Sequence, residues 1–142
     1  MGILPFANLY RYLLKMTMNI TPERLIKDIQ QEFSLFFPFL RIEFLRKPHP
    51  FMDSNHKVCT LPNEFIIGHA AKHSVEKNIE ITSSMTVREL EESCERNFGV
   101  YVKFYRKSGG LWLEVTMTDN WTMKQQNDLG SEISILFDNY NL

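Results

Sequence analysis

The chain has 142 residues, 16 basic and 17 acidic side chains, a formal net charge of −1 and 13% aromatic residues. Disordered chains are poor in aromatic side chains, so these values argue against a chain that stays unfolded. A charge balance this close to zero argues against nucleic acid or an anionic membrane as an electrostatically held partner. The length fits one domain, and two cysteines without a disulfide pattern favour a reducing, cytoplasmic location.

Residues 1–18 form an apolar N-terminal extension ahead of a single domain at 19–142. The extension contains one proline and two basic residues, and no apolar run in it reaches the ~18 residues of a membrane span. It also lacks the basic start and the small-residue cleavage site of a signal peptide. Two interpretations remain open: residues 1–15 are a helix packed on the domain, or translation begins at Met16 or Met18.

The first helix is predicted to begin at Thr21, which suits an N-cap, with Pro22 at the first helical position. It ends near Phe36, because the residue before Pro38 is disfavoured in a helix. Its apolar residues follow at helical spacing: Leu25, Ile26, Ile29 and Phe33. Residues 39–45 then alternate apolar and charged side chains, which predicts a half-buried strand.

Residues 46–63 contain three prolines and are predicted to form a long loop. For residues 64–73 the pattern leaves a short helix and a strand both open. Residues 78–82 alternate and predict a strand. A second helix starts at Ser84 or Thr86 and is followed by Gly99, a residue typical of helix ends. Its apolar stripe is Val87, Leu90, Cys94 and Phe98.

A hairpin is predicted next, with strands at 100–106 and 111–115 joined by a turn at 108–110. The last helix begins near Asp119 or Thr122. Within it, one glycine lowers the helix propensity by about 1 kcal/mol relative to Ala. The predicted core stripe of this helix is Leu129, Ile133, Leu136 and Phe137.

The two helix–strand units look alike. Three residues of the first helix match residues 65 positions later in the second, as Thr21, Leu25 and Phe33 match Thr86, Leu90 and Phe98. The strand at 40–47 matches the strand at 100–107, 60 positions later. Either the unit is duplicated, or any capped helix followed by an alternating strand gives this pattern. The expected fold is a single α+β domain with a mostly antiparallel sheet and helices on one face, ferredoxin-like or β-grasp-like.

Several segments of the second half carry a resemblance: 85–91 (MTVRELE), 98–99 (FG), 104–109 (FYRKSG) and 118–122 (TDNWT), with Gln126, Asn127 and Gly130. They resemble an uncharacterised family of small bacterial proteins. The resemblance implies a bacterial, cytoplasmic protein, and it transfers no activity and no binding residues.

Cysteine and histidine side chains are concentrated in one part of the chain. His56 and Cys59 are three residues apart, and His69 and His73 are four apart, so on a helix the latter pair would share one face. Cys and His ligands of this kind suit a tetrahedral zinc site. The alternative is a set of solvated or singly hydrogen-bonded histidines.

The hairpin predicts an aromatic surface. If Val100 and its alternating neighbours point into the core, the opposite face of the sheet carries four side chains: Tyr101, Lys103, Tyr105 and Trp112. Arg41 and Arg106 are predicted to complete a charged rim. Such a face could bind a protein partner or a second copy, pack within the molecule, or stack single-stranded bases.

No catalytic signature is present in the sequence: it contains no Gly-x-Ser-x-Gly elbow, no Walker loop and no dinucleotide-binding fingerprint. The leading hypothesis is therefore a non-enzymatic protein-interaction module that presents the aromatic sheet face to a protein partner or to another copy of itself. The alternatives are a zinc-binding protein that uses the Cys and His cluster, and a module that binds single-stranded nucleic acid.

Overall fold

The computed structural model of the chain describes residues 17–46, 59–73 and 77–140. Three helices and two antiparallel sheets form one small domain, which confirms the predicted α+β class. The elements follow in this order: β1 (Met18–Ile20), α2 (Ile26–Phe36), β2 (Leu40–Arg46), β3 (Cys59–Thr60), η1 (Ile67–Ala70), β4 (Ile79–Ile81), α3 (Val87–Phe98), β5 (Val100–Ser108), β6 (Leu111–Glu114) and α4 (Met123–Tyr140).

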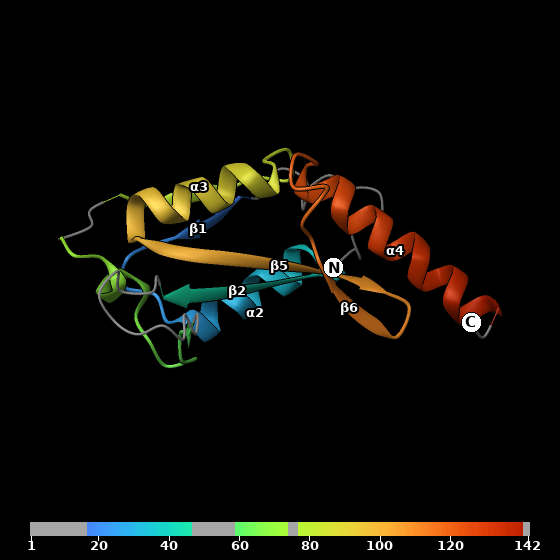
Figure 1. The fold of residues 1–142 in the computed structure, drawn as a ribbon, viewed down its shortest axis with the longest axis horizontal. Coiled ribbons are helices and arrows are strands. Elements are labelled where there is room, and N and C mark those ends of the chain that lie inside the picture. Colours follow the sequence, from blue (N-terminus) through green and yellow to red (C-terminus); the bar gives the residue numbers. More distant parts are fainter. Residues whose placement is uncertain (1–16, 47–58, 74–76, 141–142) are drawn as a thin grey trace, which may run out of the picture.

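The larger sheet has the strand order β3-β2-β5-β6, and every neighbouring pair is antiparallel (Figure 1). The two long central strands pair Ile42 with Phe104 and Glu43 with Lys103. Successive side chains of a strand point to opposite faces, so the alternating sequence gives the sheet one apolar face. Its central residues are all buried: Leu40, Ile42, Phe44, Val100, Val102 and Phe104. We call this the inner face, and the opposite side the outer face.

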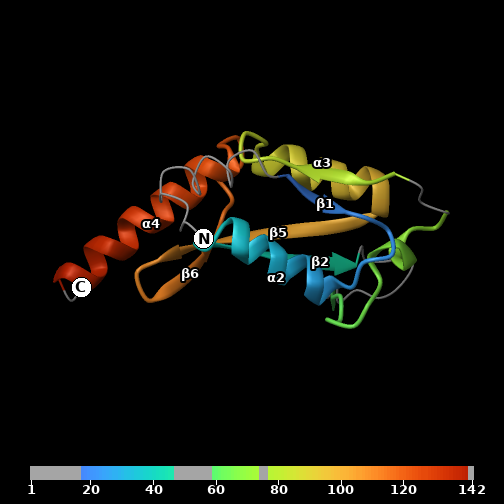
Figure 2. The ribbon, with the colours of Figure 1, turned by 180° about the vertical axis from the view of Figure 1, so that it is seen from behind.

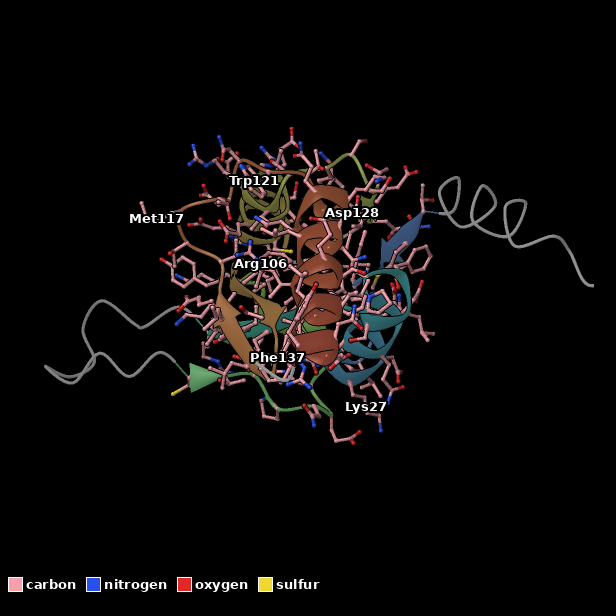
Figure 3. All side chains as sticks on the ribbon, turned by 90° about the vertical axis from the view of Figure 1, so that its right-hand side faces the viewer. Lys27, Arg106, Met117, Trp121, Asp128 and Phe137 are labelled. Atoms are coloured by element: carbon pink, nitrogen blue, oxygen red, sulfur yellow. The ribbon has the colours of Figure 1, made fainter. Side chains whose placement is uncertain are left out.

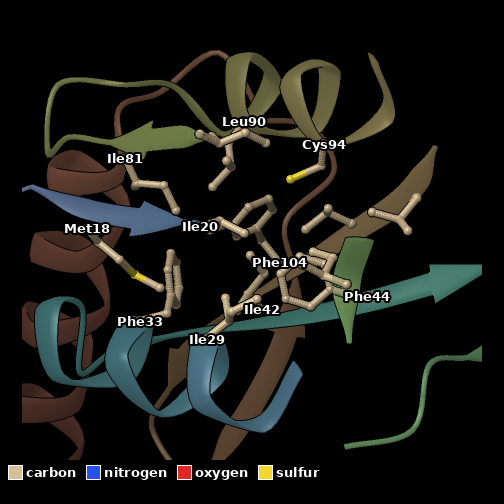
Figure 4. Packing of buried hydrophobic residues seen from close by; sticks show 14 of the residues in the cluster. Met18, Ile20, Ile29, Phe33, Ile42, Phe44, Ile81, Leu90, Cys94 and Phe104 are labelled. Carbon is tan, nitrogen blue, oxygen red and sulfur yellow. The ribbon is translucent and has the colours of Figure 1, made fainter. Parts of the chain in front are cut away.

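The core lies between the inner face and a layer made of α2, α3 and the two-stranded ribbon of β1 and β4 (Figure 4). Phe33 of α2 packs against Phe104 of β5 with their ring centroids 5.9 Å apart. Leu90 of α3 and Met18 of β1 are completely buried in the same cluster. All three long helices lie on this side of the sheet, as predicted. At the far end, α4 and the β5–β6 hairpin extend beyond the core (Figure 2).

The second predicted helix is confirmed in detail. Thr86 is the N-cap of α3, its hydroxyl oxygen accepts from the N–H of Glu89, and the Glu89 carboxylate accepts from the N–H of Thr86. This reciprocal pair is a capping box. Gly99 ends the helix in the left-handed conformation with φ of 66°. The predicted stripe is buried throughout, as Val87, Leu90, Cys94 and Phe98.

The start predicted for the first helix is wrong. The N-cap of α2 is Leu25, not Thr21, and its side chain makes no capping hydrogen bond. The first N–H groups of the helix are satisfied instead by a distant loop. Ile26 donates to the carbonyl of Phe65 at 2.9 Å, and Lys27 donates to the carbonyl of Asn63 at 3.0 Å. The cap therefore depends on tertiary contacts, which helix-start residues in the sequence do not reveal.

The start of α3 repeats these backbone hydrogen bonds. The N–H groups of its first two residues donate to the carbonyls of Trp121 and Asp119, which also belong to a segment much later in the chain. The N-caps of α2 and α3 are therefore equivalent positions. The three matches predicted 65 positions apart are therefore wrong, because the N-cap of α2 is Leu25 and not Thr21. They are Thr21 with Thr86, Leu25 with Leu90, and Phe33 with Phe98.

The two central strands make corresponding backbone hydrogen bonds at residues 60 positions apart. Phe44 of β2 accepts from the N–H of Leu61, and Phe104 of β5 accepts from the N–H of Val115, in both cases at 2.8 Å. Strands β2 and β5 thus occupy equivalent positions, each paired with the other at the centre of the sheet.

The predicted core stripe of α4 is wrong. The buried residues of this helix are Met123, Gln126, Gly130 and Ser134. A Cβ atom on Gly130 would lie 2.8 Å from Cβ of Phe39 and 3.2 Å from Cγ of Arg106. The helix therefore approaches the sheet mainly through small and polar residues. The apolar stripe that contains Leu136 does not form this contact with the sheet.

The remaining segment predictions have mixed outcomes. The undecided stretch at 64–73 contains the short 3₁₀ helix η1. Strand β1 starts at Met18, so the predicted boundary after residue 18 falls inside a strand. The two interpretations of residues 1–15 lie outside the described residues. Among the helices that the structure describes, none is long and apolar enough to cross a membrane.

Candidate functional site

The outer face brings together most of the side chains predicted to form a binding surface. Tyr101, Lys103 and Tyr105 of β5 alternate with buried residues, and Arg41 of β2 pairs with Tyr105 in the sheet register. Trp112 of β6 reaches the same face. The guanidinium carbon of Arg41 lies 3.9 Å from the centroid of the Trp112 ring, which is a cation–π contact.

These side chains largely contact one another. The Tyr105 hydroxyl donates to a carboxylate oxygen of Glu43 at 3.3 Å. Nζ of Lys103 lies 3.5 Å from Oε1 of Glu114. Burial raises the pKa of the Tyr105 hydroxyl, and the negative charge of the nearby Glu43 carboxylate raises it further. The outer face is thus a surface of mixed charge whose aromatic rings already have contacts within the molecule.

Arg106 does not belong to this surface, and its predicted place in the rim is wrong. It follows Phe104 by two residues, so its side chain points to the inner face. There its Nη1 donates to Oε1 of Gln126 on α4 at 2.7 Å. Gln126 is fully buried and also donates to the hydroxyl of Thr118 at 2.9 Å. Arg106 therefore fixes α4 on the sheet.

The predicted zinc ligands are only partly described. His56 lies outside the described residues. Cys59 is exposed at the start of β3, and the exposed His69 lies in η1 with its ring nearly perpendicular to that of Phe65. Since η1 ends at Ala70, His69 and His73 do not share a helix. In the ranges that the structure describes, no three Cys, His, Asp or Glu side chains are placed to hold a metal ion. The zinc site stays a prediction.

A second surface, which the sequence did not predict, lies at the C-terminal end of the fold. Of the ten large hydrophobic side chains that the structure shows exposed, eight lie between residues 111 and 140. Seven partly or fully exposed apolar residues of β6 and α4 form what we call the α4–β6 apolar surface: Leu111, Leu113, Leu129, Ile133, Leu136, Phe137 and Tyr140.

The rotation of α4 places its apolar stripe on the flank nearest β6. Asn127 faces β2, because its side-chain oxygen accepts from the N–H of Phe39 at 2.9 Å. Gln126 faces β5 and the segment after β6 through Arg106 and Thr118. Residues three and four apart share a helix face, so the stripe continues from Gln126 in steps of three and four: Leu129, Ile133, Leu136 and Tyr140.

Phe137 joins this stripe to the hairpin. A Cβ atom on Gly109 would lie 2.6 Å from the Phe137 ring, so the ring packs directly on the turn (Figure 3). Gly109 also has φ of 61°, a conformation that other residues rarely adopt. Beyond the turn, the inner-face side chains of β6 remain open, with Leu111 67% and Leu113 48% exposed.

The polar segment at 118–122 has structural partners. Asp119 accepts two hydrogen bonds from the Arg88 guanidinium, at 3.0 and 3.2 Å, and this contact lowers the pKa of Asp119. Burial, followed by repulsion from Asp119, raises the pKa of Glu91 to about 7. Burial also raises the pKa of Cys94 to about 12, which keeps its thiol protonated and unreactive.

Comparisons with known proteins do not identify a family for the chain. No family model matches it, and neither a curated protein nor a solved structure matches it. The resemblance to an uncharacterised bacterial family stays a prediction.

Proposed function

We propose that the protein is an interaction module that binds a protein partner through the α4–β6 apolar surface. The observation that carries this proposal is the exposure of a continuous apolar stripe on a helix that extends beyond the core, where Leu136 is 54% and Tyr140 69% exposed. Contiguous exposed apolar surface of this kind is typical of binding sites.

The size of the surface agrees with this role. Its five most exposed members leave the equivalent of nearly three whole side chains in water, which is on the order of 500 Å² at about 200 Å² per large side chain. A stable interface buries about 800 Å² per partner. The α4–β6 apolar surface therefore suits the centre of an interface whose rim is polar.

The outer face supports partner binding less strongly. Trp112 is stacked by Arg41, and the positive charge of Lys103 is offset by Glu114. A partner that docked there would have to replace contacts that the molecule already makes. Single-stranded nucleic acid is favoured still less, because Glu43 and Glu114 lie among the basic residues.

We also propose an internal repeat and a bacterial, cytoplasmic origin for this protein. Matching backbone hydrogen bonds recur at the starts of α2 and α3 and at the central strands β2 and β5, and they support an internal repeat of the helix–strand unit. The resemblance and the cysteine content favour a bacterial, cytoplasmic protein.

The test compares two surfaces of one folded protein. The variant Leu113→Ser/Leu136→Ser removes two exposed apolar residues from the proposed surface. Leu35→Ser is the matched control, because Leu35 is 80% exposed on α2, away from that surface. Each protein is immobilised and exposed to cell extract, and bound proteins are quantified by mass spectrometry.

We expect the wild type and the Leu35→Ser control to retain the same proteins and the double variant to lose them at least tenfold, with unchanged circular dichroism. A third variant, Tyr101→Ser/Trp112→Ser, changes the outer face. If that variant lost the bound proteins and the double variant kept them, the outer face would be the binding site and the proposal would be wrong.

A further inference from the structure

We infer that the partner is a second copy of this chain, which pairs its β6 with β6 of the first copy across a two-fold axis at Leu113. This inference rests on the proposed function, since it names the occupant of the same surface.

Strand β6 is an open edge of the sheet. Its inner neighbour is β5, and the order β3-β2-β5-β6 places no strand on its other side within the described residues. The N–H of Val115 donates to Phe104 of β5, and backbone groups alternate in an antiparallel ladder. Leu111 and Leu113 therefore face β5 with their backbone groups, and those of Trp112 and Glu114 point off the edge.

The sequence of this edge does not protect it from pairing. Edge strands are commonly blocked by proline, lysine or an inward-pointing charge. Strand β6 is Leu-Trp-Leu-Glu, which contains no proline and no lysine, and its one charged side chain, Glu114, points to the outer face. Its inner-face side chains, Leu111 and Leu113, are apolar and exposed.

One register uses every free edge group. With the two-fold axis at Leu113, Trp112 of each copy lies opposite Glu114 of the other, and the two pairs exchange four backbone hydrogen bonds. An axis at Glu114 would place two carboxylates directly opposite each other, which is destabilising. An axis at Trp112 would pair Glu114 with Gly110, which belongs to the turn and not to the strand.

The same arrangement covers the apolar surface. The two Leu113 side chains meet on the inner face, beside the apolar stripes of both α4 helices. A two-fold interface uses the same patch on both copies, so each copy contributes its own exposed apolar area. Two acidic residues of α4, Asp128 and Asp138, lie on a different flank of the helix from this stripe, and Glu132, three residues after Leu129 and four before Leu136, borders it as part of the polar rim. The net charge of −1 gives little long-range repulsion between copies.

Cysteine cross-linking tests the register in the full chain. The background is Cys59→Ser, because Cys59 is exposed and Cys94 is buried. Leu113→Cys places two cysteines opposite each other in a non-hydrogen-bonded pair, about 4.5 Å apart between Cα atoms, which a disulfide can span at roughly 4.4–6.8 Å. Leu111→Cys is the matched control. Its two copies lie four residues apart along the strand, about 14 Å at ~3.4 Å per residue.

We expect mild oxidation to convert Leu113→Cys to a covalent dimer and to leave Leu111→Cys uncoupled, with the wild type sedimenting as a dimer without oxidation. Leu136→Ser, which changes only the helix stripe, should weaken the dimer about tenfold. Equal coupling of both cysteine variants would reflect random collision and overturn the register. A monomer at every concentration would overturn the inference of a second copy.

The monomer result also separates this inference from the proposed function. A monomeric wild type that retains other proteins through Leu113 and Leu136 means that the surface binds a different partner, so only the second copy is excluded. A monomer that dimerises once residues 1–16 are removed means that this segment occupies the surface in the full chain, and it too excludes the inference. A monomer whose double variant loses nothing in the extract experiment excludes both.

Discussion

Replacing Gly130 with alanine separates local helix preference from tertiary packing. Helix propensity alone predicts that Ala stabilises α4 by about 1 kcal/mol. The structure predicts the reverse, because the new Cβ would lie 2.8 Å from Cβ of Phe39 and 3.2 Å from its carbonyl oxygen. Carbon atoms pack best at about 3.5–4.0 Å, so α4 must move away from the sheet. That movement also stretches the 2.7 Å hydrogen bond between Arg106 and Gln126.

Overpacking of this kind costs about 1–3 kcal/mol, which offsets or exceeds the gain in helix propensity, so we expect a net loss of up to about 2 kcal/mol and a melting temperature lower by up to roughly 8 °C. Urea unfolding followed by circular dichroism measures the free energy. Asn139→Ala is the control, since Asn139 is exposed on the same helix and its replacement should stabilise by a few tenths of a kcal/mol at most. A Gly130→Ala protein more stable than the wild type would refute the close approach of α4 to Phe39.

Three further predictions concern α3. Thr86→Ala removes the capping box and should lower the free energy of unfolding by about 1 kcal/mol in urea denaturation, whereas an unchanged midpoint would mean that the cap contributes nothing. The pKa of Glu91 is about 7 in the fold and 4.5 ordinarily, so the folded state binds more protons between these values and stability falls as pH rises through them. Glu91→Gln should remove this slope and stabilise the protein by on the order of 1 kcal/mol near pH 8, after allowance for solvent screening; a slope that persists contradicts the assignment. The buried Cys94, with its pKa raised to about 12, should resist iodoacetamide until the protein unfolds, and rapid alkylation in the folded protein would show that α3 opens.

Helix α3 could be predicted from sequence because its determinants are local. Thr86 and Glu89 cap each other within one turn, Gly99 takes the left-handed conformation at the end, and the residues between them bury one stripe. The central strands were predictable for the same reason, since strict alternation of apolar and charged side chains leaves one face to bury.

The start of α2 could not be predicted, because its cap comes from carbonyl groups of Asn63 and Phe65, which lie much further along the chain. Thr21 followed by Pro22 has the composition of a helix start but lies before it. Local sequence carries no information about a cap supplied by a loop that folds back.

The errors in α4 and at Arg106 have separate causes. Periodicity shows that Leu129 and Leu136 share a flank of α4, but it does not show which flank meets the sheet. Gly130 and Ser134, four residues apart, mark the contact side and were a usable signal for close packing. For Arg106, the strand alternation that buries residue 104 already places residue 106 on the inner face, so the predicted rim contradicted the strand pattern.

The pairing of the two halves governs the order in which the chain can fold. Strand β1 finds its partner in β4, where Met18 pairs with Ile81, and β2 finds its long partner in β5, where Ile42 pairs with Phe104. Contacts between residues so distant in sequence slow folding, because a large loop must close before they form. During synthesis, the first half therefore waits for residues 79–108 to leave the ribosome before its core strands can pair.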